Sequence, residues 1–203
     1  AINMGNCVLF VDTLDTAFNL DVKGFKQRSV SSPNNEIIIK GPQEAFVESI
    51  RVNTSMLRRA TNTENLVIEN VLVGKLSKTP CAICYLKNIA NSDLVAEVRY
   101  RLNNLEIDTL LSTGQLEQLI CEDNKYNIPQ VLSTERPDKA AKNLYAGRVV
   151  ILVNGNPYCI ILPATIVDFI SSPEDTNLKP IFANFLKILR FLAMGITLLL
   201  PSI

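Results

Sequence analysis

Histidine is absent from this chain of 203 residues. Histidine is the commonest general base near pH 7, the usual activator of serine and cysteine nucleophiles, and the commonest metal ligand. Its absence lowers the odds of an enzyme, although enzymes that use paired carboxylates or lysine stay open. The sequence patterns G-x-G-x-x-G, P-loop, G-x-S-x-G and H-E-x-x-H are also missing. We therefore assign no catalytic, cofactor-binding or metal-binding residue.

The chain also lacks an excess of either charge, because 20 lysines and arginines balance 20 aspartates and glutamates. A protein that binds phosphate backbones normally carries a basic excess. Nucleic acid is therefore not an expected partner.

Cysteines are few and odd in number, five in all, and they lie scattered through apolar runs. Secreted domains that depend on disulfides usually carry a denser, even set, so a reducing compartment is expected. Cys81 and Cys84 form a C-x-x-C pattern inside an apolar run that reads as a strand. Positions i and i+3 of a strand face opposite sides of the sheet, so we expect two buried thiols rather than a redox or zinc pair.

Hydrophobic residues make up 47% of the chain, and their spacing alternates between strand and helix periods. The apolar run at residues 7–11 is short and ends at Asp12, which indicates a strand and not a signal peptide. The expected strands are 7–11, 17–22, 36–39, 66–73, 81–89, 128–132, 148–153 and 158–162, with a brief one around 107–110. The expected helices are 43–60, 91–101, 113–120, 137–145 and 164–170, with an apolar helix after 177.

This order predicts a mixed α/β (α+β) chain with two small α/β subdomains, each a small mixed sheet with packed helices. We place the first subdomain at residues 1–104, the second at 105–176 and a C-terminal apolar helix at 177–203. That helix has thirteen uncharged residues from Phe191 onward, fewer than the roughly 20 that a bilayer span requires. A buried core helix and the truncated start of a transmembrane segment both fit its composition.

A charged helix start, Glu135-Arg136-Pro137-Asp138, stands ahead of a plain hairpin with an Asn-Gly turn. Pro137 suits the first helical turn, and Asp138 is favourable at the positive end of the helix dipole. Glu135 and Arg136 project beside them in one interpretation and contact a partner domain or the sibling subdomain. In the other interpretation they form an ordinary capping box with an internal ion pair.

The chain resembles the amino-terminal soluble region of the A subunit of GerA-type spore germinant receptors. The likeness is collinear and specific as a series rather than in any one piece. It rests on KGPQEAFVESIRVNTSMLRR, YLKNIANSDLVAEVRYRL, STERPDKAAKNLYAGRVVILVNGNPYCIILPAT, and SPED ahead of FLKILRFLAMGITLLLPS. The family usually has arginine at position 40, glutamate at 146 and aspartate at 154, where this chain has Lys40, Ala146 and Asn154. The positive charge at position 40 is kept, while the acidic charges at 146 and 154 are lost. No role is therefore assigned to a carboxylate at those two positions.

The resemblance implies a fragment whose apolar tail begins the first membrane span of a longer protein. It implies a spore inner-membrane receptor with a transporter-like B subunit, a lipoprotein C subunit and a homo-oligomer of A subunits. The soluble part is expected on the cytoplasmic or core side, and the membrane is reached after residue 177.

Two functions follow as hypotheses. The first is a non-catalytic sensing and assembly domain, with the candidate interface residues Glu135, Arg136, Asp138, Arg148, Lys40, Glu44 and Arg51. The second is a nutrient-binding module with a pocket between the subdomains. Its candidate cleft residues are Tyr85, Asn91, Tyr145 and Tyr158.

Overall fold

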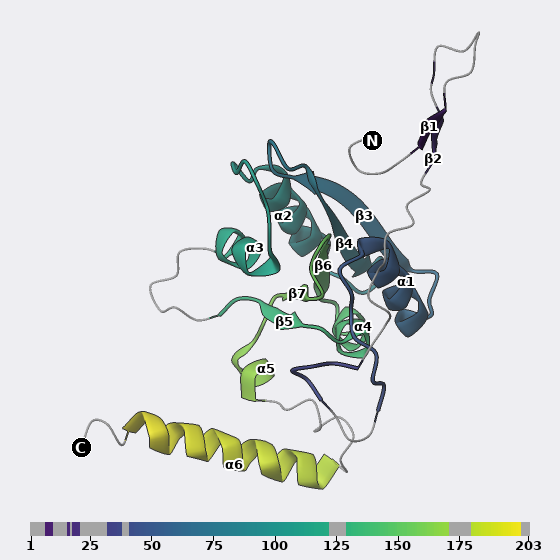
Figure 1. Cartoon of the computed structure of the whole chain (residues 1–203). Helices are drawn as coiled ribbons and strands as arrows, with labels where there is room; N and C mark the ends of the chain where they lie inside the picture. The colour runs from purple at the N-terminus through teal and green to yellow at the C-terminus, as the bar shows by residue number, and fades with distance from the viewer. Residues whose placement is uncertain are drawn as a thin grey trace.

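A five-stranded antiparallel sheet is the centre of the molecule (Figure 1). The computed structural model describes residues 7–9, 16, 18–20, 32–37, 41–121, 129–170 and 180–199. In spatial order, the strands are β3 (Leu66–Val73), β4 (Thr79–Leu86), β6 (Val149–Val153), β7 (Cys159–Leu162) and β5 (Leu132–Thr134). The predicted mixed α/β class is confirmed.

Helices cover both faces of this sheet (Figure 1). On one face α1 (Ile50–Thr61) and α4 (Pro137–Tyr145) pack over Cys84, and on the other α2 (Ser92–Asn103) and α3 (Thr113–Ile120) pack over Cys81. The two cysteines therefore lie on opposite faces, as predicted. Burial raises the pKa of both thiols to about 12, so both stay protonated and unreactive at neutral pH.

Strands from both predicted subdomains share the sheet, which differs from the expectation of a separate sheet in each. β4 pairs with β6 from Cys81 opposite Val153 to Cys84 opposite Val150. All five residues of β6 and the middle four of β4 are buried. Strands that are apolar on both faces need neighbours on both edges and cover on both sides, and one continuous sheet supplies them. The limits 1–104 and 105–176 remain a prediction about separable units.

The first long helix begins later than the predicted residue 43, because α1 starts at Ile50. Residues 45–47 are buried without being helical. The amide of Phe46 donates to the carbonyl of Glu135 at 2.8 Å. The side chain of Asn53 bonds both backbone groups of Val47, at 2.8 and 2.6 Å. These distant partners satisfy the backbone that a helix would otherwise satisfy internally.

The other elements lie where they were predicted but with shifted ends, such as that of β4, which ends at Leu86 and not at residue 89; three predictions in the described residues are wrong. Ile107 and Leu110 lie in a loop, where the carbonyl of Ile107 accepts from the amide of Lys75 at 2.8 Å. Glu36 and Ile37 do not belong to a strand, and residues 38–39 lie outside the described part. Residues 129–131 precede β5 instead of forming it.

The remaining elements lie toward the two ends of the chain (Figure 1). They are the antiparallel hairpin β1 (Cys7–Leu9) and β2 (Phe18–Leu20), and the helices α5 (Ile166–Ile170) and α6 (Pro180–Leu199). Helix α6 carries many exposed apolar side chains. Within the described residues, no helix combines the length and apolarity that crossing a bilayer requires.

Candidate functional site

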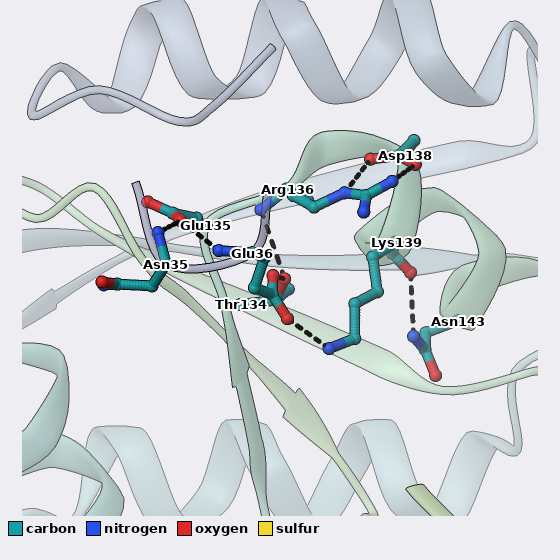
Figure 2. A network of polar contacts seen from close by, with 8 residues as sticks. All are labelled: Asn35, Glu36, Thr134, Glu135, Arg136, Asp138, Lys139 and Asn143. Atoms are coloured by element: carbon teal, nitrogen blue, oxygen red, sulfur yellow. Dashed lines mark hydrogen bonds and ion pairs between the residues drawn. The ribbon is translucent and has the colours of Figure 1, made fainter. Parts of the chain in front are cut away.

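The corner between β5 and α4 binds the backbone amides of Asn35 and Glu36 and the side chain of Glu36, which come from much earlier in the chain (Figure 2). One carboxylate oxygen of Glu135, Oε1, accepts from the backbone amides of Asn35 at 2.6 Å and Glu36 at 3.0 Å. The backbone carbonyl of Glu135 accepts from Phe46. One residue thus fixes two segments that lie about a hundred positions earlier in the sequence.

Glu36 is held from the other side by two residues of the same corner (Figure 2). Its carboxylate forms an ion pair of 2.5 Å with Lys139 and accepts a short hydrogen bond from the hydroxyl of Thr134. Lys139 lies in the first turn of α4, and its backbone carbonyl accepts from the side-chain Nδ2 of Asn143 at 2.8 Å. Charge-assisted bonds of this kind are stronger than neutral ones.

Arg136 turns its guanidinium to Asp138, two residues along the chain. Its Nε donates to Oδ1 at 3.0 Å and its Nη2 to Oδ2 at 2.5 Å, while the buried Nη1 has no hydrogen-bond partner. Glu135 and Arg136 are each 3% exposed, so they lie inside the fold instead of projecting from the helix start. This is the internal ion pair of the second interpretation. The capping differs from a capping box, because the helix N-cap is Arg136 and its side chain makes no cap bond.

Beside this corner, a groove of about 380 Å³ runs between α1 and α4. We call it the α1–α4 groove; it is lined by Pro42, Glu44, Met56, Arg59, Ala60, Pro137, Asp138, Ala141, Lys142 and Tyr145. Glu44 and Arg59 form an exposed ion pair of 2.5 Å at its rim. The phenol of Tyr145 donates a short hydrogen bond to the carbonyl of Thr61, at the end of α1.

Arg148, another predicted interface residue, connects the start of β6 to the helix α5. Its guanidinium forms an ion pair of 2.8 Å with Asp168 of α5 and donates to Asn143 at 2.9 Å. Burial acts to raise the pKa of Asp168, but hydrogen bonds from Thr165 and Arg148 outweigh it and leave the pKa below its ordinary value. The pair therefore stays ionised at neutral pH.

The four predicted cleft residues lie at separate places. Tyr145 lines the α1–α4 groove. Tyr85 donates to Glu69 at 2.6 Å on the α2 side of the sheet. Asn91 caps α2 by accepting from the amide of Asp93 at 2.8 Å, and Tyr158 accepts a short bond from Asn35. The structure does not bring these four side chains into one cleft.

The seven predicted interface residues are divided in the same way. Glu44 and Asp138 line the α1–α4 groove, next to the buried Glu135 and Arg136. Arg51 is exposed on α1, and Lys40 lies outside the described residues.

The residues that were not predicted as functional include Glu36 and Lys139 of the corner, and Asn53 of α1. Asn53 carried a usable signal, because it is a polar residue on the apolar stripe of its helix. Glu36 and Lys139 stand 103 positions apart and have no local signal at all. In the part of the chain that the structure describes, no three histidine, cysteine or acidic side chains gather as a metal site requires.

The family model described as Bacillus/Clostridium GerA spore germination protein matches residues 1–203. Spore germination protein B1 of Bacillus subtilis (strain 168) is 40% identical over 200 residues, which are 98% of this chain and 41% of that protein. Spore germination protein A1 of the same organism is 38% identical over the same shares of the two chains.

A solved structure is similar as well: the N-terminal domain of the A subunit of the Bacillus megaterium spore germinant receptor GerK3. It is 42% identical, with a TM-score of 0.49, and the match covers 60% of this chain and 97% of that one.

The chain belongs to the GerA spore germination protein family, as the collinear resemblance predicted. It spans about two fifths of the length of the curated relatives that it matches.

Proposed function

We propose that this segment is a non-catalytic sensing and assembly domain of a germinant receptor A subunit. It couples nutrient occupancy of the receptor to a membrane part that lies further along the full protein and releases ions. Its partners are a transporter-like B subunit, a lipoprotein C subunit and further A subunits in the spore inner membrane, with this domain on the core side. Family membership supports the placement in spore germination.

The observation that carries the coupling role is the ion pair between Arg148 and Asp168. Arg148 precedes the central strand β6, whose residues are all buried. Asp168 lies in α5, which contacts α6. A displacement of the sheet is therefore passed to α5 through a charged, half-buried link, and from α5 to the apolar α6.

The test is to break this link in the full-length receptor. Arg148→Ala removes the pair, and we expect germination in response to nutrient to slow while the domain keeps its fold and the receptor its level in spores. Glu97→Ala is the control, because it removes an ion pair of 2.6 Å with Arg101 within α2 and does not line the α1–α4 groove. Equal germination rates for Arg148→Ala and wild type, at equal receptor levels, would contradict the proposal.

A second candidate function, direct nutrient binding, rests on the α1–α4 groove. The groove combines apolar lining from Met56, Ala60 and Ala141 with carboxylates and cationic groups at its sides. This mixture suits a small ligand that carries both charges, such as an amino acid. Calorimetric titration of the chain with L-amino acids, sugars and nucleosides tests it. Saturable binding that Ala141→Leu abolishes supports the groove, and flat isotherms remove it within the affinity range of the method.

A further inference from the structure

Strand β3 forms an open edge of the central sheet. It pairs with β4 along its whole length, from Leu66 opposite Leu86 to Val73 opposite Thr79. In the described part of the chain, no strand pairs with its other side. The outward backbone amides and carbonyls of an edge strand are a template for a further strand.

The opposite edge of the sheet is closed by the chain itself. Strand β5 has three residues. The residue that follows it, Glu135, bonds the amides of Asn35, Glu36 and Phe46. The two edges of the sheet are therefore treated differently, and only β3 remains long and open within the described residues.

β3 lacks most of the features that usually protect an edge. Natural edge strands are blocked by lysine, proline, a bulge or short length. β3 reads LVIENVLV, with eight residues, no lysine, no proline and an unbroken register against β4. Its Leu72 side chain is 63% exposed.

The single charged residue of β3, Glu69, already forms an ion pair inside the chain. Arg99 of α2 donates to both of its carboxylate oxygens at 2.8 Å, and Tyr85 donates a third bond at 2.6 Å. The bonds from Arg99 hold the pKa of Glu69 below its ordinary value although burial acts to raise it. Glu69 therefore stays ionised with its charge balanced by Arg99, so it does not repel an uncharged residue placed opposite, although a second carboxylate placed directly opposite would still be unfavourable.

We propose that β3 pairs antiparallel with β3 of a second copy of this chain, in a register centred on Asn70. A twofold axis perpendicular to the sheet keeps every side chain on its own face of the sheet. Because side chains alternate between the faces, a residue of one copy can lie opposite a residue of the other copy only if their numbers differ by an even number. The two longest registers then pair residues 66–72 or residues 67–73. The first places Glu69 opposite Glu69 of the second copy, which is unfavourable for like charges.

The second register has no such conflict and is self-complementary. It places Asn70 opposite Asn70 of the second copy, and Glu69 opposite Val71. It also places Ile68 opposite Leu72, so that the exposed Leu72 gains an apolar cross-strand neighbour. Apolar cross-strand pairs of this kind stabilise a sheet. This self-complementarity is what favours a second copy over an unrelated strand, and the inference does not depend on the proposed coupling role.

Sedimentation velocity of the whole chain over a range of concentrations tests the proposal. We expect a reversible dimer whose dissociation constant rises about tenfold or more in Asn70→Lys/Leu72→Lys, because lysines block edge strands. Both positions are exposed, so the circular dichroism spectrum should not change. Ser55→Lys/Leu111→Lys is the matched control; it places the same charges at exposed positions of α1 and of the loop before α3. It should dimerise as the wild type does.

A cross-linking experiment fixes the register. With Cys7 and Cys121 replaced by serine, Asn70→Cys should give a disulfide-linked dimer on mild oxidation, while Glu64→Cys, exposed just before β3, should not. A monomeric wild type overturns the proposal, as does equal dimerisation of the two lysine variants, which would place the contact elsewhere, on α6 for example. Cross-linking at Glu64 and not at Asn70 overturns the register.

Discussion

Asn53 is a fully buried polar residue. Its side-chain amide supplies the hydrogen bonds that secondary structure would otherwise give to a neighbouring buried segment. Its Oδ1 accepts from the amide of Val47, and its Nδ2 donates to the carbonyl of the same residue. Ala45, Phe46 and Val47 can be buried without a helix because this side chain and Glu135 take up their backbone groups. The amide of Asn53 and the carbonyl of Glu135 therefore let the chain stay non-helical until the N-cap of α1, Ser49.

Asn53→Ala should destabilise the domain by about 2–6 kcal/mol, since two buried backbone groups of Val47 lose their partners and each costs roughly 1–3 kcal/mol. Urea unfolding followed by circular dichroism measures the change. Ser55→Ala, at an exposed position of the same helix, should stay within about 0.5 kcal/mol of wild type. Equal stability of Asn53→Ala and Ser55→Ala would show that water replaces the amide.

At the scale of elements, α5 is the short helix whose position depends on charge. Its apolar side chains Ile166, Val167 and Phe169 are about half exposed or more, so burial contributes little to holding it. Among the described contacts of α5 are the ion pair from Arg148 and the bonds between Thr165 and Asp168. A helix held by a carboxylate should respond to acid.

The pKa of Asp168 lies below its ordinary value of 3.8 in the folded chain. A lowered folded pKa stabilises the fold above the unfolded pKa, and this contribution is lost as the pH falls through the folded value. We therefore expect the free-energy difference between wild type and Asp168→Asn, about 1 kcal/mol at pH 7, to shrink steadily below about pH 4. Chemical unfolding at a series of pH values measures it, with Glu64→Gln, at an exposed position, as the control. A difference that is constant down to pH 2 would exclude this role.

At the scale of the whole molecule, the pairing of β4 with β6 joins the strands between residues 66 and 162 into one sheet. The helices that cover its α1–α4 face come from both sides of residue 104, as do α2 and α3 on the other face. The core of either half is therefore completed by the other.

The fragment 1–104 should accordingly fail to fold alone, because β4 would expose the edge and the apolar faces that β6 and α4 cover. Heteronuclear NMR spectra of that fragment should show little amide dispersion, and addition of residues 105–203 should restore it. A well-dispersed spectrum of the isolated fragment would instead support the predicted subdomain boundary.

The sequence by itself determined most elements, because their signals are local. Asn91 and Pro137 mark helix starts, Asn154-Gly155 marks a hairpin, and the alternation around Cys81 and Cys84 places the two thiols on opposite faces. It also determined the family, because a long collinear series of such segments is specific.

Only the tertiary structure decided the sheet order, the start of α1 and the inward course of Glu135 and Arg136. Partners far along the chain decide them: Cys81 pairs with Val153, Phe46 bonds Glu135, and Glu135 bonds Asn35 and Glu36. Glu135-Arg136-Pro137-Asp138 has the composition of a solvent-exposed helix start. A glutamate that binds water and one that binds a distant backbone amide cannot be distinguished in the sequence. The difference is made by which segment packs on the corner, and that is a property of the folded chain.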